Sequence, residues 1–94
     1  MSTQSSRVIV TVLGQDQVGI IAAVANILAD ARANIVDISQ TLMGSMFTMI
    51  MMVDTTGATA SFDELKRRLN AKGDELGLQI DAQREDVFQF MHRV

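Results

Sequence analysis

The stretch TVLGQDQVGII, residues 11–21, sets the fold, because it joins an apolar strand to an amphipathic helix through a short polar loop. Aliphatic residues lead into Gly14, where the absence of a side chain permits backbone angles that other residues avoid. The first amides of a helix have no partner inside the helix and lie at the positive end of its dipole. With Asp16 beside these amides, the loop offers a partner for a carboxylate and another for an ammonium group. We therefore expect this corner to suit an α-amino acid.

A plainer interpretation of the same corner stays open. Aspartate is a favoured helix cap and glycine is common in turns, so Asp16 could simply cap the helix and the loop could be only a tight connection. In the binding interpretation, Gly19 leaves room for a ligand or another backbone to approach the start of the helix.

Around this corner, hydrophobic periodicity predicts alternating strands and helices. One helix is expected from Ile20 to Ala31, and a second starts at Ser61, which forms a capping box with Glu64, and stops at Gly77. Alternating apolar and polar side chains predict four strands, at residues 7–13, 34–42, 46–54 and 78–83.

The strands at 7–13 and 46–54 are the most apolar and belong in the middle of the sheet, whereas 34–42 and 78–83 are more polar and belong at its edges. The order βαββαβ predicts an α+β fold, the ferredoxin-like sandwich, with two helices on one face of an antiparallel four-stranded sheet. Helical spacing in residues 85–94 adds a short C-terminal helix.

Two helices cover only one face of such a sheet. The second face would carry Ile9, Leu13, Ile50 and Met52, and so much contiguous apolar area is unusual on a monomer. We therefore expect a homodimer, with the C-terminal helix covering part of this face or extending a subunit contact.

Composition narrows the class of protein. The 94 residues suffice for one domain, residues 1–94, of which 1–6 are expected to be loose. Without cysteine there are no disulfides or thiolate metal sites, and the opening MSTQSSR has no apolar signal segment. No apolar run approaches the roughly 20 residues of a membrane span, so the sequence predicts a cytoplasmic protein that does not enter a membrane. A net charge of −3 and scattered basic residues argue against nucleic-acid binding.

Catalytic and metal sites find little support in the sequence. His92 has no serine nucleophile to pair with, and polar surroundings give Asp16 and Asp37 no buried setting for acid–base work. The methionines between 43 and 52 alternate between the two faces of a strand, which favours a core or interface over a thioether site for cuprous ion. The sequence therefore predicts no enzyme, no metal and no cofactor.

The run TVLGQDQVGIIAAVANILADARANIVDISQ, residues 11–40, resembles the first half of an ACT domain, whose signature is a strand, a loop of the form G-x-D-x-x-G-(I/L), a helix and a strand that begins Asn-Ile. With FTMIMMVD and the closing DVFQFMHRV, the chain from residue 7 onward is similar to small stand-alone ACT proteins related to the glycine cleavage system repressor.

This resemblance implies a function and a site. ACT domains generally bind amino acids or other small effectors at subunit interfaces and transmit that binding to a metabolic enzyme or regulator. Val18 stands where many members carry proline, which implies a less rigid loop. The alternative is a ligand-free module that docks an unknown protein partner through the same fold. Carried over by position, the ligand-binding residues are Gly14, Asp16, Val18, Gly19, Ile20 and Asn34.

Overall fold

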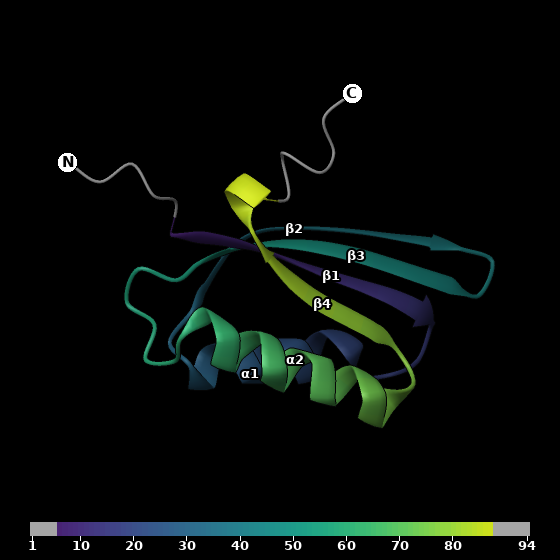
Figure 1. The fold of residues 1–94 in the computed structure, drawn as a ribbon. Coiled ribbons are helices and arrows are strands. Elements are labelled where there is room, and N and C mark those ends of the chain that lie inside the picture. Colours follow the sequence, from purple (N-terminus) through teal and green to yellow (C-terminus); the bar gives the residue numbers. More distant parts are fainter. Residues whose placement is uncertain (1–5, 88–94) are drawn as a thin grey trace.

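The computed structural model describes residues 6–87 and has two layers, a sheet above a pair of helices (Figure 1). Both helices lie on the same side of the sheet, as the sequence predicted. The elements are β1 (Arg7–Gln15), α1 (Ile20–Asp30), β2 (Asn34–Met43), β3 (Met46–Asp54), α2 (Phe62–Leu76) and β4 (Gln79–Arg84).

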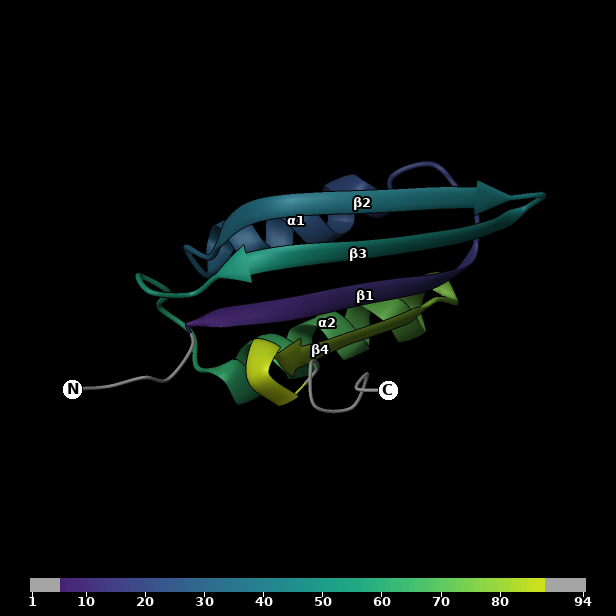
Figure 2. The same cartoon turned by 90° about the horizontal axis from the view of Figure 1, so that it is seen from above.

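The sheet confirms the predicted topology. Its order is β2-β3-β1-β4, so the two apolar strands are central and the two polar strands are edges (Figure 2). Every neighbouring pair is antiparallel. Among the residues that the structure describes, the only shift of register is in β2 between Ile35 and Asp37, where Val36 has no partner on β3. This bulge bends the start of an edge strand.

The core lies between the sheet and the helices. Val8, Val10 and Val12 of β1 are at most 3% exposed, and they meet the buried stripe of α1 formed by Ile20, Val24 and Leu28. Leu65 and Leu69 of α2, which lies on the same side of the sheet as α1, complete this core. The strand period of two and the helix period of 3.6 thus place their apolar sides on one shared surface.

Helix α2 begins and ends as its sequence indicated. The Ser61 side chain accepts a hydrogen bond from the Glu64 amide at 3.1 Å, and Gly77 ends the helix in the left-handed conformation at φ 73°. The Glu64 carboxylate pairs with Arg67 and Arg68 on its own helix, and these contacts lower its pKa. Half of the expected capping box, the bond that the Ser61 side chain accepts from the Glu64 amide, is therefore formed.

The second face of the sheet is only partly covered. Leu13 and Ile50 are each 42% exposed there, as expected, but Ile9 is 4% exposed. Ile9 lies between Met52 of β3 and Gln83 of β4, near the end of the sheet where the chain leaves β4. The apolar area open to solvent therefore concentrates toward the other end of this face.

Beyond β4, residues 85–87 are helical, which agrees with the predicted short C-terminal helix. The helical spacing that predicts this helix also involves apolar residues outside the described part of the chain, namely Phe88, Met91 and Val94. His92 and residues 1–5 of the N-terminal segment that was expected to be loose lie outside it as well. Ser6 is described, and its carbonyl accepts hydrogen bonds from the Thr55 amide and hydroxyl at 2.8 and 2.5 Å.

Candidate functional site

The corner between β1 and α1 presents unpaired helix amides. Helix α1 has Gly19 at its N-cap position, in the left-handed conformation at φ 91°, and no side chain caps the helix. The first helical bond is from the Ala23 amide to the Gly19 carbonyl at 2.9 Å. Within residues 6–87, nothing accepts a hydrogen bond from the amides of Ile20, Ile21 and Ala22, and the first turn contains no acidic residue. These three amides can receive an anion.

Asp16 does not cap helix α1, so this part of the plainer interpretation is wrong, whereas a loop that is only a tight connection stays an alternative. Glycine occupies the capping position instead, because a left-handed backbone there favours a residue without a side chain. The Asp16 backbone amide donates to the Ser45 carbonyl at 2.9 Å, which ties the loop to the turn between β2 and β3. Its carboxylate is exposed and has no bonded partner in the described part of the chain.

Gly14 is a glycine for a different reason from the one the sequence suggested. It lies inside β1, which continues to Gln15, and its φ is not positive. A Cβ at this position would overlap the Leu78 side chain, which lies directly over it. The constraint is close packing across the sheet, which local sequence does not reveal.

Two further loop residues differ sharply in exposure. Val18 is fully exposed at 102%, whereas the Ile20 side chain is 2% exposed and belongs to the core. Val18 can therefore contact a ligand or a neighbouring molecule directly. Ile20 can contribute only its backbone amide.

Gln17 was missed by the sequence reasoning. Its Nε2 donates to the Leu76 carbonyl at 3.1 Å, at the C-terminal end of α2. The loop is thereby fastened both to the β2–β3 turn, through Asp16, and to α2. No spacing in the sequence distinguished Gln17 from an ordinary solvated loop residue.

Asn34 lies at the opposite end of the molecule from this corner. It pairs across the sheet with Asp54, which in turn pairs with Arg7, whereas Gly14 pairs with Phe47 near the other end. The seven steps along the strand from Arg7 to Gly14 span about 23 Å at the usual rise of a strand. A single chain therefore does not bring the predicted site residues together.

Beside Asn34, the carboxylate of Asp54 is held by its own turn. It accepts hydrogen bonds from the Thr56 hydroxyl at 2.7 Å and the Thr56 amide at 2.9 Å, and these bonds lower the pKa of Asp54. Asp54 is thus kept ionised next to the start of β2.

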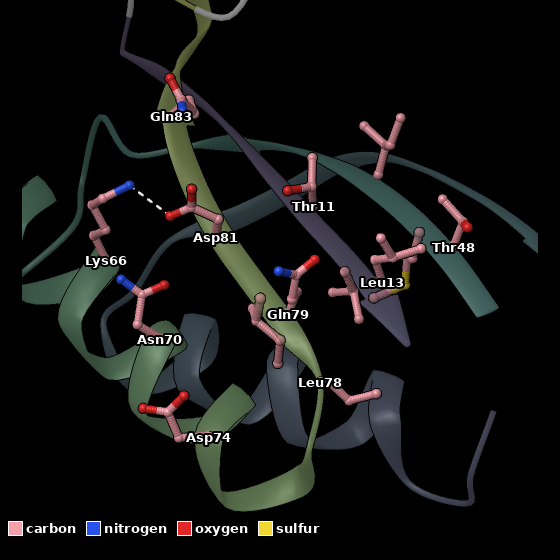
Figure 3. A pocket seen from close by; sticks show the side chains of 14 residues that line it. Thr11, Leu13, Thr48, Lys66, Asn70, Asp74, Leu78, Gln79, Asp81 and Gln83 are labelled. Carbon is pink, nitrogen blue, oxygen red and sulfur yellow. Dashed lines mark hydrogen bonds and ion pairs between the residues drawn. The ribbon is translucent and has the colours of Figure 1, made fainter. Parts of the chain in front are cut away.

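A hollow of about 820 Å³ lies elsewhere, along β4 and α2 (Figure 3). Thr11, Leu13 and Thr48 border it from the central strands, and Gln79 and Asn70 from β4 and α2. None of the six predicted residues lines it.

Within residues 6–87 there is no group of three or more histidine, aspartate or glutamate side chains placed to hold a metal ion. The same part of the chain contains no helix that is long and apolar enough to cross a membrane.

Comparison with known proteins gives a family match. Residues 6–83 match the sequence model of a protein family whose description is "ACT domain". A UPF0237 protein from Methanocaldococcus jannaschii is 51% identical over 89 residues, which cover 95% of this chain and 99% of that protein.

Two solved structures have similar folds. An ACT domain protein from Streptococcus pneumoniae superposes with a TM-score of 0.77 at 34% identity, over 90% of this chain and 96% of that chain. A putative glycine cleavage system transcriptional repressor gives a TM-score of 0.73 over 83% of this chain and 44% of that chain. At 23% identity, the second match supports a shared fold alone.

Proposed function

This chain belongs to the ACT domain family, and from that premise we propose that it is a small regulatory protein in which two copies sense an amino acid, or a similar small effector, at their interface. The observation that carries the proposal is the uncapped start of α1 beside the unpartnered Asp16 carboxylate. These groups match the two charged ends of an α-amino acid.

The dimer of the proposal forms through β2. This edge strand is ten residues long, and all its residues except Ile35 are exposed. When two β2 strands pair antiparallel, the start of one lies beside the end of the other. Asn34 of the second copy then approaches the turn at Ser45, to which the loop of the first copy is bonded through Asp16. Asn34 and the loop are far apart within one chain, but antiparallel pairing brings Asn34 of one copy close to the loop of the other.

The sequence alone favoured a contact through the second face of the sheet. Burial of Ile9 within one chain reduces the apolar area there, and Leu13 and Ile50 are only about half exposed. The β2 edge also offers unpaired backbone groups, which give a strand partner both affinity and register.

In this dimer the effector carboxylate accepts hydrogen bonds from the amides of Ile20, Ile21 and Ala22, and its ammonium contacts Asp16. The side-chain amide of Asn34 from the second copy supplies further hydrogen bonds. Because the effector bridges two chains, its binding shifts the population of dimer arrangements, and a metabolic enzyme or regulator can respond to that shift.

A thermal-shift panel of the common amino acids tests the proposal. A true effector at about 100 times its dissociation constant should stabilise the protein by roughly 2.7 kcal/mol. Asp16→Asn should weaken binding by roughly 1.5–3 kcal/mol, because a charge-assisted hydrogen bond is lost. Folding should barely change, because Asp16 caps nothing. An effector bound equally well by Asp16→Asn would refute the site.

The β2 edge is tested by Gln40→Pro. The amide of Ile38 points away from β3, because it donates to the Asp37 side chain. Gln40 is two residues further along the strand with no register shift between them, so its amide points the same way. Proline at this position removes no bond of the sheet but blocks a pairing strand. Gln40→Pro should be a folded monomer in light scattering, whereas the control Gln40→Ala should remain a dimer.

The second candidate is a ligand-free interaction module, favoured by the half-exposed Leu13 and Ile50 on the open face of the sheet. This function would be supported instead if no amino acid in the panel stabilised the protein and a partner protein bound through this face.

A further inference from the structure

The two edge strands of the sheet differ in how their outward backbone groups are treated. An exposed edge is a template for another strand, and proteins commonly block it with charged side chains or with a covering element. In this molecule one edge, β4, is closed by helix α2, and the other, β2, is left open.

At the middle of β4, both outward backbone groups of Ala82 are taken. The Ala82 amide donates to Asp81 Oδ1 at 2.9 Å, and the Ala82 carbonyl accepts from Lys66 Nζ at 2.7 Å. Lys66 also forms an ion pair with Asp81 Oδ1 at 2.6 Å (Figure 3). A strand approaching β4 would find no free donor or acceptor at this residue.

Next to this point, the backbone of α2 lies against the start of β4. The Leu78 amide donates to the Gly73 carbonyl at 2.8 Å. A Cβ on Gly73 would lie 2.7 Å from the Leu78 carbonyl oxygen and 3.1 Å from the Ile80 nitrogen. The absence of a side chain at Gly73 therefore lets the helix cover the edge that the Lys66–Asp81 pair closes farther along.

The β2 edge has no such cover in the described part of the chain. The Ile38 amide bonds the side chain of its neighbour Asp37 at 2.8 Å, but no group bonds the outward backbone of Gln40 or Leu42. The strand also contains no lysine, arginine or proline.

We propose that Lys66 and Asp81 form an edge lock, which keeps β4 from pairing with another strand and so restricts edge-to-edge association of this protein to β2. With one open edge per chain, two copies meet by a two-fold axis and the assembly closes. With two open edges, β2 of one copy could pair with β4 of the next, and such a head-to-tail contact extends without limit.

The edge lock rests on the proposed function only in taking β2 as the pairing edge. Its test compares each variant with the parent protein, so it does not depend on whether an amino acid binds. If the parent protein is a monomer, the proposed dimer fails, but a gain of association on removing the lock still supports the inference.

The test is the double variant Lys66→Met/Asp81→Thr, which removes one charge of each sign and leaves the net charge unchanged. The matched control is Lys72→Met/Glu75→Gln, which removes a different ion pair, the one that joins Lys72 to Glu75 within α2 at 3.0 Å. Light scattering over a range of protein concentrations gives the mass of each variant, and circular dichroism verifies that each is folded. Hydrogen exchange of residues 79–84 reports directly on the edge.

We expect exchange in residues 79–84 to accelerate in Lys66→Met/Asp81→Thr, and its mass to rise at least about twofold above the parent protein with increasing concentration, as a second contact per chain requires. The control should match the parent in both measurements. Faster exchange with an unchanged mass would overturn the inference, and so would an equal gain of mass in the control. Should the double variant fail to fold, Lys66→Met alone is compared with Lys72→Met by the same two measurements.

Discussion

Gly73→Ala sets two physical effects against each other, and the structure decides which prevails. Alanine is favoured over glycine inside a helix by about 1 kcal/mol, so propensity alone predicts a more stable protein. The new Cβ would lie 2.7 Å from the Leu78 carbonyl oxygen, where ordinary contact begins at 3.4 Å. The helix backbone fixes the position of the Cβ and the atom that it meets is a backbone oxygen, so no side-chain rotation relieves the contact. Overpacking of this kind costs about 1–3 kcal/mol, and we take the upper end.

The net expectation is a loss of about 2 kcal/mol of unfolding free energy, which lowers the melting temperature of a domain this size by roughly 8–16 °C. Circular dichroism is the suitable probe, because the chain has no tryptophan or tyrosine. Gly57→Ala is the control, since its Cβ would meet nothing within 4 Å and its φ is not positive. All variants are compared at one protein concentration. A Gly73→Ala protein as stable as the parent, or more stable, would refute the close approach of α2 to β4.

Three further changes have defined outcomes. Ile50→Glu should leave the dimer intact in light scattering if association runs through β2, and dissociation would place the contact on the open sheet face. Thr56→Val removes the largest cause of the lowered pKa of Asp54, so an NMR titration should find a higher pKa for Asp54 than in the parent protein. The stabilising contribution of ionised Asp54 is lost as pH falls through its folded pKa, so in Thr56→Val this contribution should be smaller and should be lost at a higher pH than in the parent protein. Ser61→Ala should destabilise the fold by about 1 kcal/mol in urea unfolding, through loss of the cap on α2.

The fold was predictable because the signals that specify it are local and periodic. Alternation in β1 and β3, the helical stripe from Ile20 to Leu28, and the Ser61 cap each depend on residues close together in sequence. Contrast in polarity between the strands was enough to order the sheet. In each of these features, the polarity of a side chain is enough to predict whether it is buried.

The details of the site were not predictable, because they depend on contacts distant in sequence. Gly14 is small because Leu78 lies over it, and Gln17 is fixed by the Leu76 carbonyl. The role of Asp16 was ambiguous because aspartate suits both a cap and an ionic contact, and only the position of Gly19 on the helix excludes the first.

The distance between Asn34 and the β1–α1 corner has a genetic consequence. In the two-fold pair that we propose, each of the two sites combines the corner of one chain with Asn34 of the other. If the effector binds as proposed, a chain that lacks Asp16 and a chain that lacks Asn34 should each lose effector binding when expressed alone. In a mixed pair both defects fall in one site, and the other site is intact. Two alleles that are null separately should therefore complement each other when expressed in the same cell, which no receptor contained within one chain would allow.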